Sequence, residues 1–182
     1  MTTPVVAGHP RWEQGTAQIA ATRCRFCDEV RPDDRQAVRA LVESTEFFRA
    51  DEIDIAVELV DERLARGSAS GYEFIFAELD TALAGYACYG PIPCTTASFD
   101  LYWIAVDPRH QRHGVGRALM AAVESRVAAL GGQRIYIDTS GKEQYAPTRA
   151  FYERNGFSCE ARLQDFYAPG DDRVIYVKIV SR

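Results

Sequence analysis

Apolar residues recur with a helical period in several segments of the chain. After Pro32-Asp33-Asp34, a typical helix start, Val38, Leu41 and Val42 are spaced to share one helix face. The pair Gly131-Gly132 is a typical helix stop. This spacing predicts four helices: one from Pro32-Asp33-Asp34 onward, one from Asp51 to near Gly67, one over Gly114–Leu130 and one over Thr148–Asn155.

Runs of aromatic and branched residues predict strands between these helices. The densest run, Ser98–Val106, ends abruptly at Asp107-Pro108. Residues 1–22 have no sustained period, so we expect an irregular N-terminal lead-in, followed by a single domain of the α+β class over residues 23–182. The predicted strands are Arg23–Arg31, Tyr72–Leu79, Leu83–Gly90, Ser98–Val106, Arg134–Thr139, Phe157–Phe166 and Arg173–Val180.

Composition and charge narrow the class of protein. The 182 residues are 47% apolar and 26% charged, which is ordinary for a globular domain. The net charge of −5 disfavours a nucleic-acid partner, and no apolar run is long enough for a membrane helix. The N-terminus is not a secretory signal, and the five cysteines are odd in number and irregularly spaced. We therefore expect a cytoplasmic protein with reduced thiols, and no metal at the isolated Cys24–Cys27 pair.

The segment after the densest strand carries the clearest chemistry. Glycines that open a helix let the backbone approach a ligand, and the free amides of a helix N-terminus bind anions such as pyrophosphate. A P-loop would need a Lys after Gly114, and a dinucleotide fingerprint would need Gly at Leu119. The pattern Q/RxxGxG/A is matched in full by Gln111–Gly116. A helix that merely starts with glycines is the plain alternative.

Together, three motifs resemble the GNAT superfamily of acetyl-CoA-dependent N-acetyltransferases. They are Ile104-Ala105-Val106-Asp107-Pro108, Gln111–Gly116 and Phe151-Tyr152-Glu153-Arg154-Asn155-Gly156-Phe157, and the resemblance covers about residues 23–180. It implies a mixed, mostly antiparallel sheet flanked by helices and splayed between its fourth strand, Ser98–Val106, and its fifth, Arg134–Thr139. It also implies that acetyl-CoA binds in the resulting cleft.

The same resemblance implies roles for individual residues. The backbone of the segment Ile104, Ala105 and Val106 would bind the pantetheine arm, and the Ile104 amide would donate to the thioester carbonyl. Tyr152 would border the cofactor and serve as the general acid, since a phenol with a pKa near 10 keeps its proton at neutral pH. A purely packing role for its ring is the alternative. The pyrophosphate would be held in the loop opened by Gln111, by the amides of Arg112, His113, Gly114, Val115, Gly116 and Arg117.

The proton acceptor is predicted less directly. Some superfamily members place a catalytic Glu where this chain has Asp100, and Asp is depleted in strand interiors. Strand alternation would put Asp100 on the face of Ile104, roughly 13 Å away, so ordered water would have to relay the proton. The alternative is that Asp100 lies at the frayed start of the strand or pairs with an Arg. Glu46, Glu52 and Glu78 are reserve candidates.

The acceptor site is expected where the family pattern constrains the chain least. Many members carry Asn where this chain has Tyr145, so Tyr145 is expected to face the acceptor. Phe47, Phe48 and Glu52 are the other candidate acceptor contacts, although core packing is the plain alternative for the two Phe residues. The turn Asp165–Asp172 would shape the acceptor site or a homodimer contact. The expected reaction is acetyl transfer from acetyl-CoA to a primary amine of a small molecule, amino acid or peptide. Acetylation of protein N-termini or lysines, and a non-catalytic acyl-CoA sensor, are the alternatives.

Overall fold

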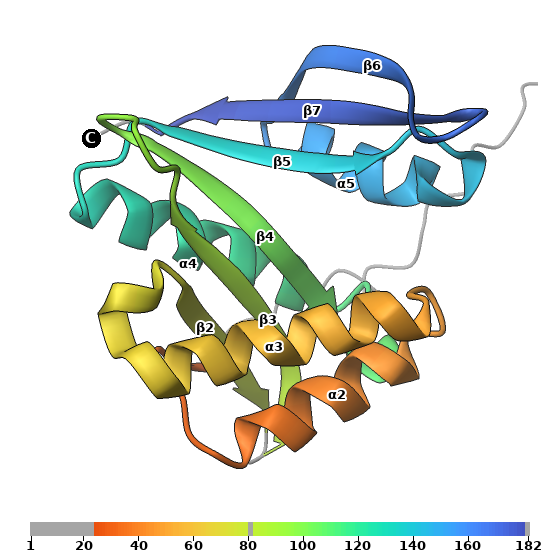
Figure 1. The fold of residues 1–182 in the computed structure, drawn as a ribbon. Helices are drawn as coiled ribbons and strands as arrows, with labels where there is room; N and C mark the ends of the chain where they lie inside the picture. Colours follow the sequence, from red (N-terminus) through yellow and green to blue (C-terminus); the bar gives the residue numbers. More distant parts are fainter. Residues whose placement is uncertain (1–23, 80–81, 181–182) are drawn as a thin grey trace, which may run out of the picture.

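Strand pairing in the computed structural model, which describes residues 24–79 and 82–180, produces a seven-stranded sheet with the order β1-β2-β3-β4-β5-β7-β6 (Figure 1). Every neighbouring pair is antiparallel except β4 and β5, which are parallel. The strands are β1 (Arg25–Cys27), β2 (Glu73–Leu79), β3 (Ala82–Pro91), β4 (Ser98–Val106), β5 (Arg134–Ser140), β6 (Ser158–Ala168) and β7 (Asp171–Ile179). The predicted α+β class with a mixed, mostly antiparallel sheet is confirmed.

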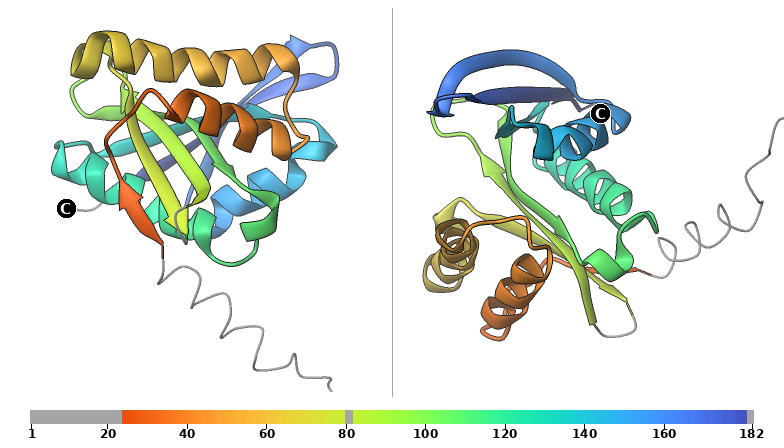
Figure 2. Two further views of the ribbon diagram at one scale, coloured as in Figure 1. Left: turned by 90° about the horizontal axis from the view of Figure 1, so that it is seen from below. Right: turned by 90° about the vertical axis from the view of Figure 1, so that its right-hand side faces the viewer.

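Four α-helices flank the sheet: α2 (Asp34–Ser44), α3 (Ala50–Arg66), α4 (Val115–Ala129) and α5 (Ala146–Arg154). Helices α2 and α3 cover one face and α4 the other, while α5 packs beside β5 and β7 (Figure 2). One core packs α4 and Tyr152 against the sheet, and a second packs α2 and α3 against the opposite face of β2 and β3. None of the helices in the described residues is both long and apolar enough to cross a bilayer.

Most predicted elements occur within a few residues of their expected ends, and the first strand is the main correction. The prediction of Arg23–Arg31 is too long, because the pairing of β1 with β2 ends at Cys27. Asp28 is already turned toward α4, where its carboxylate accepts hydrogen bonds from Arg126 at 3.0–3.2 Å. Helix α5 starts earlier than predicted, because Pro147 fits its first turn. The predicted lead-in over residues 1–22 lies outside the described residues.

The parallel pair β4–β5 separates along its length. Its register consists of three pairs that end at Asp100↔Tyr136. Beyond that point β4 stays paired with β3 as far as Val106, and β5 stays paired with β7 as far as Ser140. The sheet is therefore splayed between its fourth and fifth strands, as predicted, and one edge of β4 faces the opening.

A β-bulge changes which side chains of β4 share a face. Cys88 pairs with Trp103 and Tyr89 pairs with Leu101, so Tyr102 is an extra residue in β4. Phe99 and Leu101 pack into the core beneath α4, and Ile104 and Val106 pack against the same core, whereas Tyr102, Trp103 and Ala105 pack against the core of α2 and α3. The prediction that Asp100 shares a face with Ile104 is therefore wrong, because the bulge interrupts the two-residue alternation between them.

Candidate active site

The turn after β4 is fixed by side chains that bind its backbone. Asp107 is buried and accepts hydrogen bonds from the Arg109 amide at 2.8 Å and from the Arg109 guanidinium at 2.7–3.2 Å. These hydrogen bonds from Arg109 hold the pKa of Asp107 below its usual range. The Gln111 side chain donates to the Val106 carbonyl at 3.1 Å, which ties the next loop to the end of β4. The end of β4 and the start of the loop are thus held together.

The loop before α4 directs its backbone toward the opening of the sheet. Arg112 and Gly114 both have left-handed backbone conformations, with φ of 61° and 87°. Glycine takes this conformation without steric cost, and Gly114 is the N-cap of the fifteen-residue helix α4. The first amides of α4 have no partner within the helix, and they carry the positive end of its dipole. This end of α4 therefore has the geometry and charge of an anion site.

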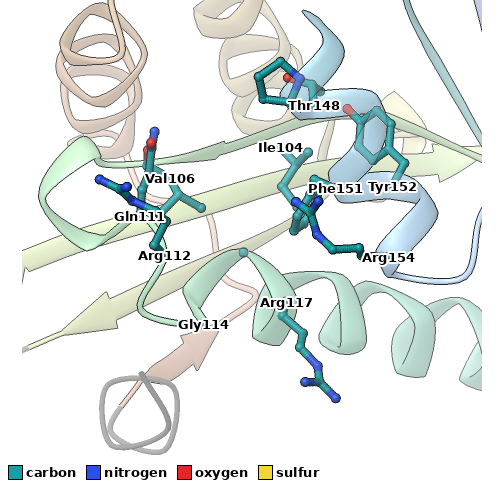
Figure 3. A pocket seen from close by; sticks show the side chains of 12 residues that line it. Ile104, Val106, Gln111, Arg112, Gly114, Arg117, Thr148, Phe151, Tyr152 and Arg154 are labelled. Carbon is teal, nitrogen blue, oxygen red and sulfur yellow. The ribbon is translucent and has the colours of Figure 1, made fainter. Parts of the chain in front are cut away.

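A cavity of about 500 Å³ lies between this loop and α5. Gly116 lets the two elements approach closely, since a Cβ on it would lie 3.3 Å from the Phe151 ring. Arg154 extends from α5 into the space between α5 and α4 (Figure 3). Within the described residues, neither Arg112, Arg117 nor Arg154 forms an ion pair with a carboxylate, so their charges suit a polyanionic ligand. The cavity is lined by Ile104, Val106, Gln111, Arg112, Gly114, Gly116, Arg117, Pro147, Thr148, Phe151, Tyr152 and Arg154.

A second cavity, of about 790 Å³, adjoins the first on the side of α2 and α3. We call it the acceptor cavity, because the residues predicted to contact the acceptor line it. Its lining residues from the α2–α3 junction, the start of α3 and β4 are Thr45, Phe47, Phe48, Arg49, Glu52, Ile55 and residues 102–106. The remaining lining residues, apart from Gln111, come from β5, the segment before α5, α5 itself and the β6–β7 hairpin: Asp138, Thr139, Ser140, Lys142, Gln144, Tyr145, Pro147, Thr148, Tyr152, Tyr167, Ala168 and Asp171.

Tyr152 and Ile104 lie where the two cavities meet, since both residues line both cavities. Tyr152 is 6% exposed, and its ring packs against Phe157 and Tyr176 with centroids 6.2 and 5.7 Å away. Burial, followed by the neighbouring Tyr145 and Tyr176, raises the pKa of the Tyr152 phenol well above its usual value. The phenol therefore stays protonated throughout the physiological pH range.

One wall of the acceptor cavity is polar, and its groups are paired with one another. Asp171 is 7% exposed, accepts a hydrogen bond from the Ser140 hydroxyl and forms an ion pair with the Lys142 ammonium at 3.1 Å. Burial opposes ionisation of Asp171, but these two donors outweigh it and lower the pKa of the carboxyl. On the same wall, Asp138 forms an ion pair with Arg173.

Most of the predicted site residues line the two cavities. Phe47, Phe48, Glu52 and Tyr145 line the acceptor cavity, and Ala105 lines it from β4. The loop residues line the first cavity except Val115, which is fully buried in the core, and His113, which is exposed. Asp100 lines neither cavity; burial and the neighbouring Asp138 raise its pKa. The Glu46 and Glu78 side chains also lie outside both linings.

Several lining residues were not among the predicted ones. Thr148 and Phe151 precede Tyr152 by four and one positions, so helical spacing alone could have placed Thr148 on its face. Arg154 follows Tyr152 within the same motif. Asp138, Ser140 and Lys142 have no such signal, because only the pairing of β5 with β7 brings Ser140 and Lys142 to Asp171 and Asp138 to Arg173.

A metal site needs several His, Cys, Asp or Glu side chains close together. In residues 24–79 and 82–180, no group of three or more His, Cys, Asp or Glu side chains is placed to hold a metal ion. Cys24 and Cys27 both have free thiols. The groups that converge on the two cavities are instead amides, arginines, phenols and carboxylates.

The chain was compared with a family model, with curated proteins and with solved structures. A family model described as the acetyltransferase (GNAT) family matches residues 26–157, and no functionally curated protein matches the chain. A solved structure from Desulfovibrio desulfuricans, assigned as an acetyltransferase of the GNAT family, is 53% identical, with a TM-score of 0.85 over 87% of this chain and 99% of its own.

More distant solved structures share the fold alone. The aminoglycoside 6′-N-acetyltransferase from Enterococcus faecium is 17% identical, with a TM-score of 0.69 over 87% of this chain and 98% of its own. The ribosomal-protein-S18-alanine N-acetyltransferase from Escherichia coli is 18% identical, with a TM-score of 0.68 over 87% of this chain and 95% of its own.

Proposed function

The chain belongs to the GNAT family of acetyltransferases, and on that premise we propose that it moves an acetyl group from acetyl-CoA directly to a primary amine of a small molecule, amino acid or peptide. One observation carries the proposal: beyond the point where β4 and β5 separate, the first cavity and the acceptor cavity adjoin, and Ile104 and Tyr152 are among the residues that line both. An acyl donor in one cavity and an amine in the other would meet at these two residues.

The residues of the first cavity fit acetyl-CoA, which supplies the acetyl group as a thioester. The amides at the start of α4 would hold its phosphates, together with Arg112, Arg117 and Arg154, which form no ion pair within residues 24–79 and 82–180. The backbone of Ile104 and Val106 would bind the pantetheine arm, because both residues lie on the part of β4 that is no longer paired with β5. The Ile104 amide would stabilise the negative charge that develops on the carbonyl oxygen, an effect that is typically worth about 3 kcal/mol for one donor.

The proton transfers can be assigned to side chains at the junction. As the amine nitrogen bonds to the carbonyl carbon and the carbon–sulfur bond breaks, the Tyr152 phenol gives its proton to the departing sulfur. The acceptor ammonium loses two protons through a carboxylate or water: one restores the Tyr152 phenol and the other is released. The net products are an acetamide, CoA and one proton. Glu52 is the more direct carboxylate candidate, because it lines the acceptor cavity. Asp100 would act only through a longer chain of water.

The proposal is tested by two measurements on the same protein. Calorimetry with acetyl-CoA measures binding to the first cavity, and release of the CoA thiol across a panel of primary amines measures transfer. We expect binding and amine-dependent thiol release. Binding without release on any amine would overturn the proposal in favour of an acyl-CoA sensor, and release only with peptide or protein amines would restrict the acceptor class.

A further inference from the structure

Four aromatic side chains form a continuous series along one side of the acceptor cavity. The rings of Tyr145 and Phe47 have centroids 4.6 Å apart at an interplanar angle of 73°. Phe47 and Phe48 follow at 5.5 Å and 79°, and Phe48 and Trp103 at 5.0 Å and 36°. These are favourable edge and tilted geometries. We call these four residues the aromatic wall.

The aromatic wall joins three elements that are distant in the sequence. Tyr145 is the N-cap of α5, Phe47 and Phe48 form the junction between α2 and α3, and Trp103 lies on β4. All four side chains line the acceptor cavity, and all four are half-buried rather than enclosed in the core. Their remaining ring surface therefore borders the cavity.

We propose, on the basis of the acetyl-transfer function above, that the aromatic wall receives an aromatic body carried by the acceptor, so that arylalkylamines are preferred over aminosugars. A ring bound here would extend the series of edge and tilted contacts. Ring faces offer no hydrogen-bond partner to hydroxyl groups, and each hydroxyl left unpaired against them would weaken binding about tenfold or more.

A ring of the acceptor that binds to the aromatic wall would lie away from the acceptor's reacting amine. Tyr145 and Tyr152 are seven residues apart, which corresponds to two turns, or about 10 Å, along an ideal helix. The amine would lie near Tyr152, at the junction of the two cavities. Its body would extend toward Tyr145, Phe47 and Phe48.

The polar side of the acceptor cavity offers carboxylates that are already paired. Asp171 is already paired with Ser140 and Lys142, and Asp138 with Arg173. A hydroxyl-rich acceptor would have to compete with these existing pairs for the two carboxylates. An apolar ring on the aromatic wall would break none, so the cavity favours an acceptor with an apolar body.

The competing explanation is that the four rings only pack the α2–α3 junction against α5. Selectivity separates the two explanations, and the probes are 2-phenylethylamine, ethylamine and glucosamine. In the parent protein we expect kcat/KM for 2-phenylethylamine to exceed that for each of the others at least about tenfold. A higher kcat/KM for glucosamine or ethylamine would overturn the proposal.

A pair of variants tests the wall itself. Phe48→Leu should reduce the ratio of kcat/KM for 2-phenylethylamine to that for ethylamine about 2- to 10-fold, the range expected from one lost aromatic contact. Phe26→Leu is the matched control, because Phe26 is a half-buried Phe on β1 that packs against the first core and lines neither cavity. The control should leave the ratio unchanged. An unchanged ratio in Phe48→Leu, with any loss confined to thermal stability, would support packing alone.

A binding measurement keeps this proposal separate from the catalytic one. Calorimetry of 2-phenylethylamine with the CoA-loaded protein reports on the wall without any transfer. No turnover of any amine would refute the acetyl-transfer function. The binding role of the aromatic wall would still be supported if 2-phenylethylamine binds to the parent and binds more weakly to Phe48→Leu. If 2-phenylethylamine binds no better than glucosamine, the proposed binding role of the aromatic wall is refuted, whatever the result of the transfer assay.

Discussion

Gly114→Ala is expected to lower both stability and acetyl-CoA affinity. Gly114 has φ of 87°, a conformation that costs a residue with a Cβ about 1–2 kcal/mol. In a chain of this size that loss corresponds to a decrease in Tm of about 2–8 °C. If the loop relaxes to relieve the strain, its amides turn away from the anion site. Losing even one hydrogen bond to a charged phosphate, worth about 1.5–3 kcal/mol, would weaken binding about 10- to 100-fold.

The opposite end of the same helix provides a matched control. Gly131, just beyond the C-terminus of α4, has φ of 82°, and a Cβ there would meet no atom within 4 Å. Gly131→Ala should therefore lose a similar amount of stability, measured as Tm by thermal unfolding, and should keep the acetyl-CoA Kd of the parent by calorimetry. Equal Kd values for the parent, Gly114→Ala and Gly131→Ala, with both variants destabilised, would refute the assignment of the anion site.

Three further predictions concern individual side chains. Tyr152→Phe should lower kcat about 10²- to 10⁴-fold with little change in acetyl-CoA Kd, because the ring is kept and the proton is lost; an effect confined to KM would limit Tyr152 to positioning. Its raised pKa also predicts no loss of kcat from this group up to about pH 10. Arg109 lowers the pKa of Asp107 in the folded state, so ionised Asp107 stabilises the fold at pH values above its unfolded pKa of about 3.9. This contribution to stability is lost as the pH falls through the folded pKa. The Tm difference between the parent and Asp107→Asn should therefore shrink between pH 7 and pH 3, and a constant difference would contradict this. Glu52→Gln should lower kcat/KM most at neutral pH and recover partly at high pH, where amines with a pKa near 10.4 lose their proton, with a smaller change for Asp100→Asn; the reverse order would assign the proton acceptor to Asp100.

Local signals in the sequence predict the elements of this fold well. The predicted strand Ser98–Val106 has the same bounds as β4. A dense run of aromatic and branched residues ends there at Asp107-Pro108, which cannot continue the strand. The Gln111–Gly116 motif predicts the loop and the start of α4, because Gly114 takes the left-handed conformation of the N-cap without steric cost. Both features depend on neighbours within a few residues.

Features that depend on partners across the sheet could not be predicted in this way. The bulge at Tyr102 arises from the register between β3 and β4, and it moves Asp100 off the face of Ile104. The Asp171–Ser140–Lys142 cluster forms only when β7 pairs with β5, and the contact of Phe47 with Tyr145 only when the α2–α3 junction reaches α5. The loop Gln111–Gly116 could therefore be located from the sequence, whereas the composition of the acceptor cavity could not.

The most direct test of direct transfer between the two cavities is a single-turnover reaction followed by mass spectrometry. Stoichiometric protein and acetyl-CoA are mixed with an amine that supports thiol release, and the acetylated amine, free CoA and intact protein are measured together over time. We predict that acetylated amine and CoA appear in equal amounts while the protein mass stays constant. A protein that gains the mass of an acetyl group before the amine does, or CoA release without acetylated amine, would contradict direct transfer at the junction of Ile104 and Tyr152.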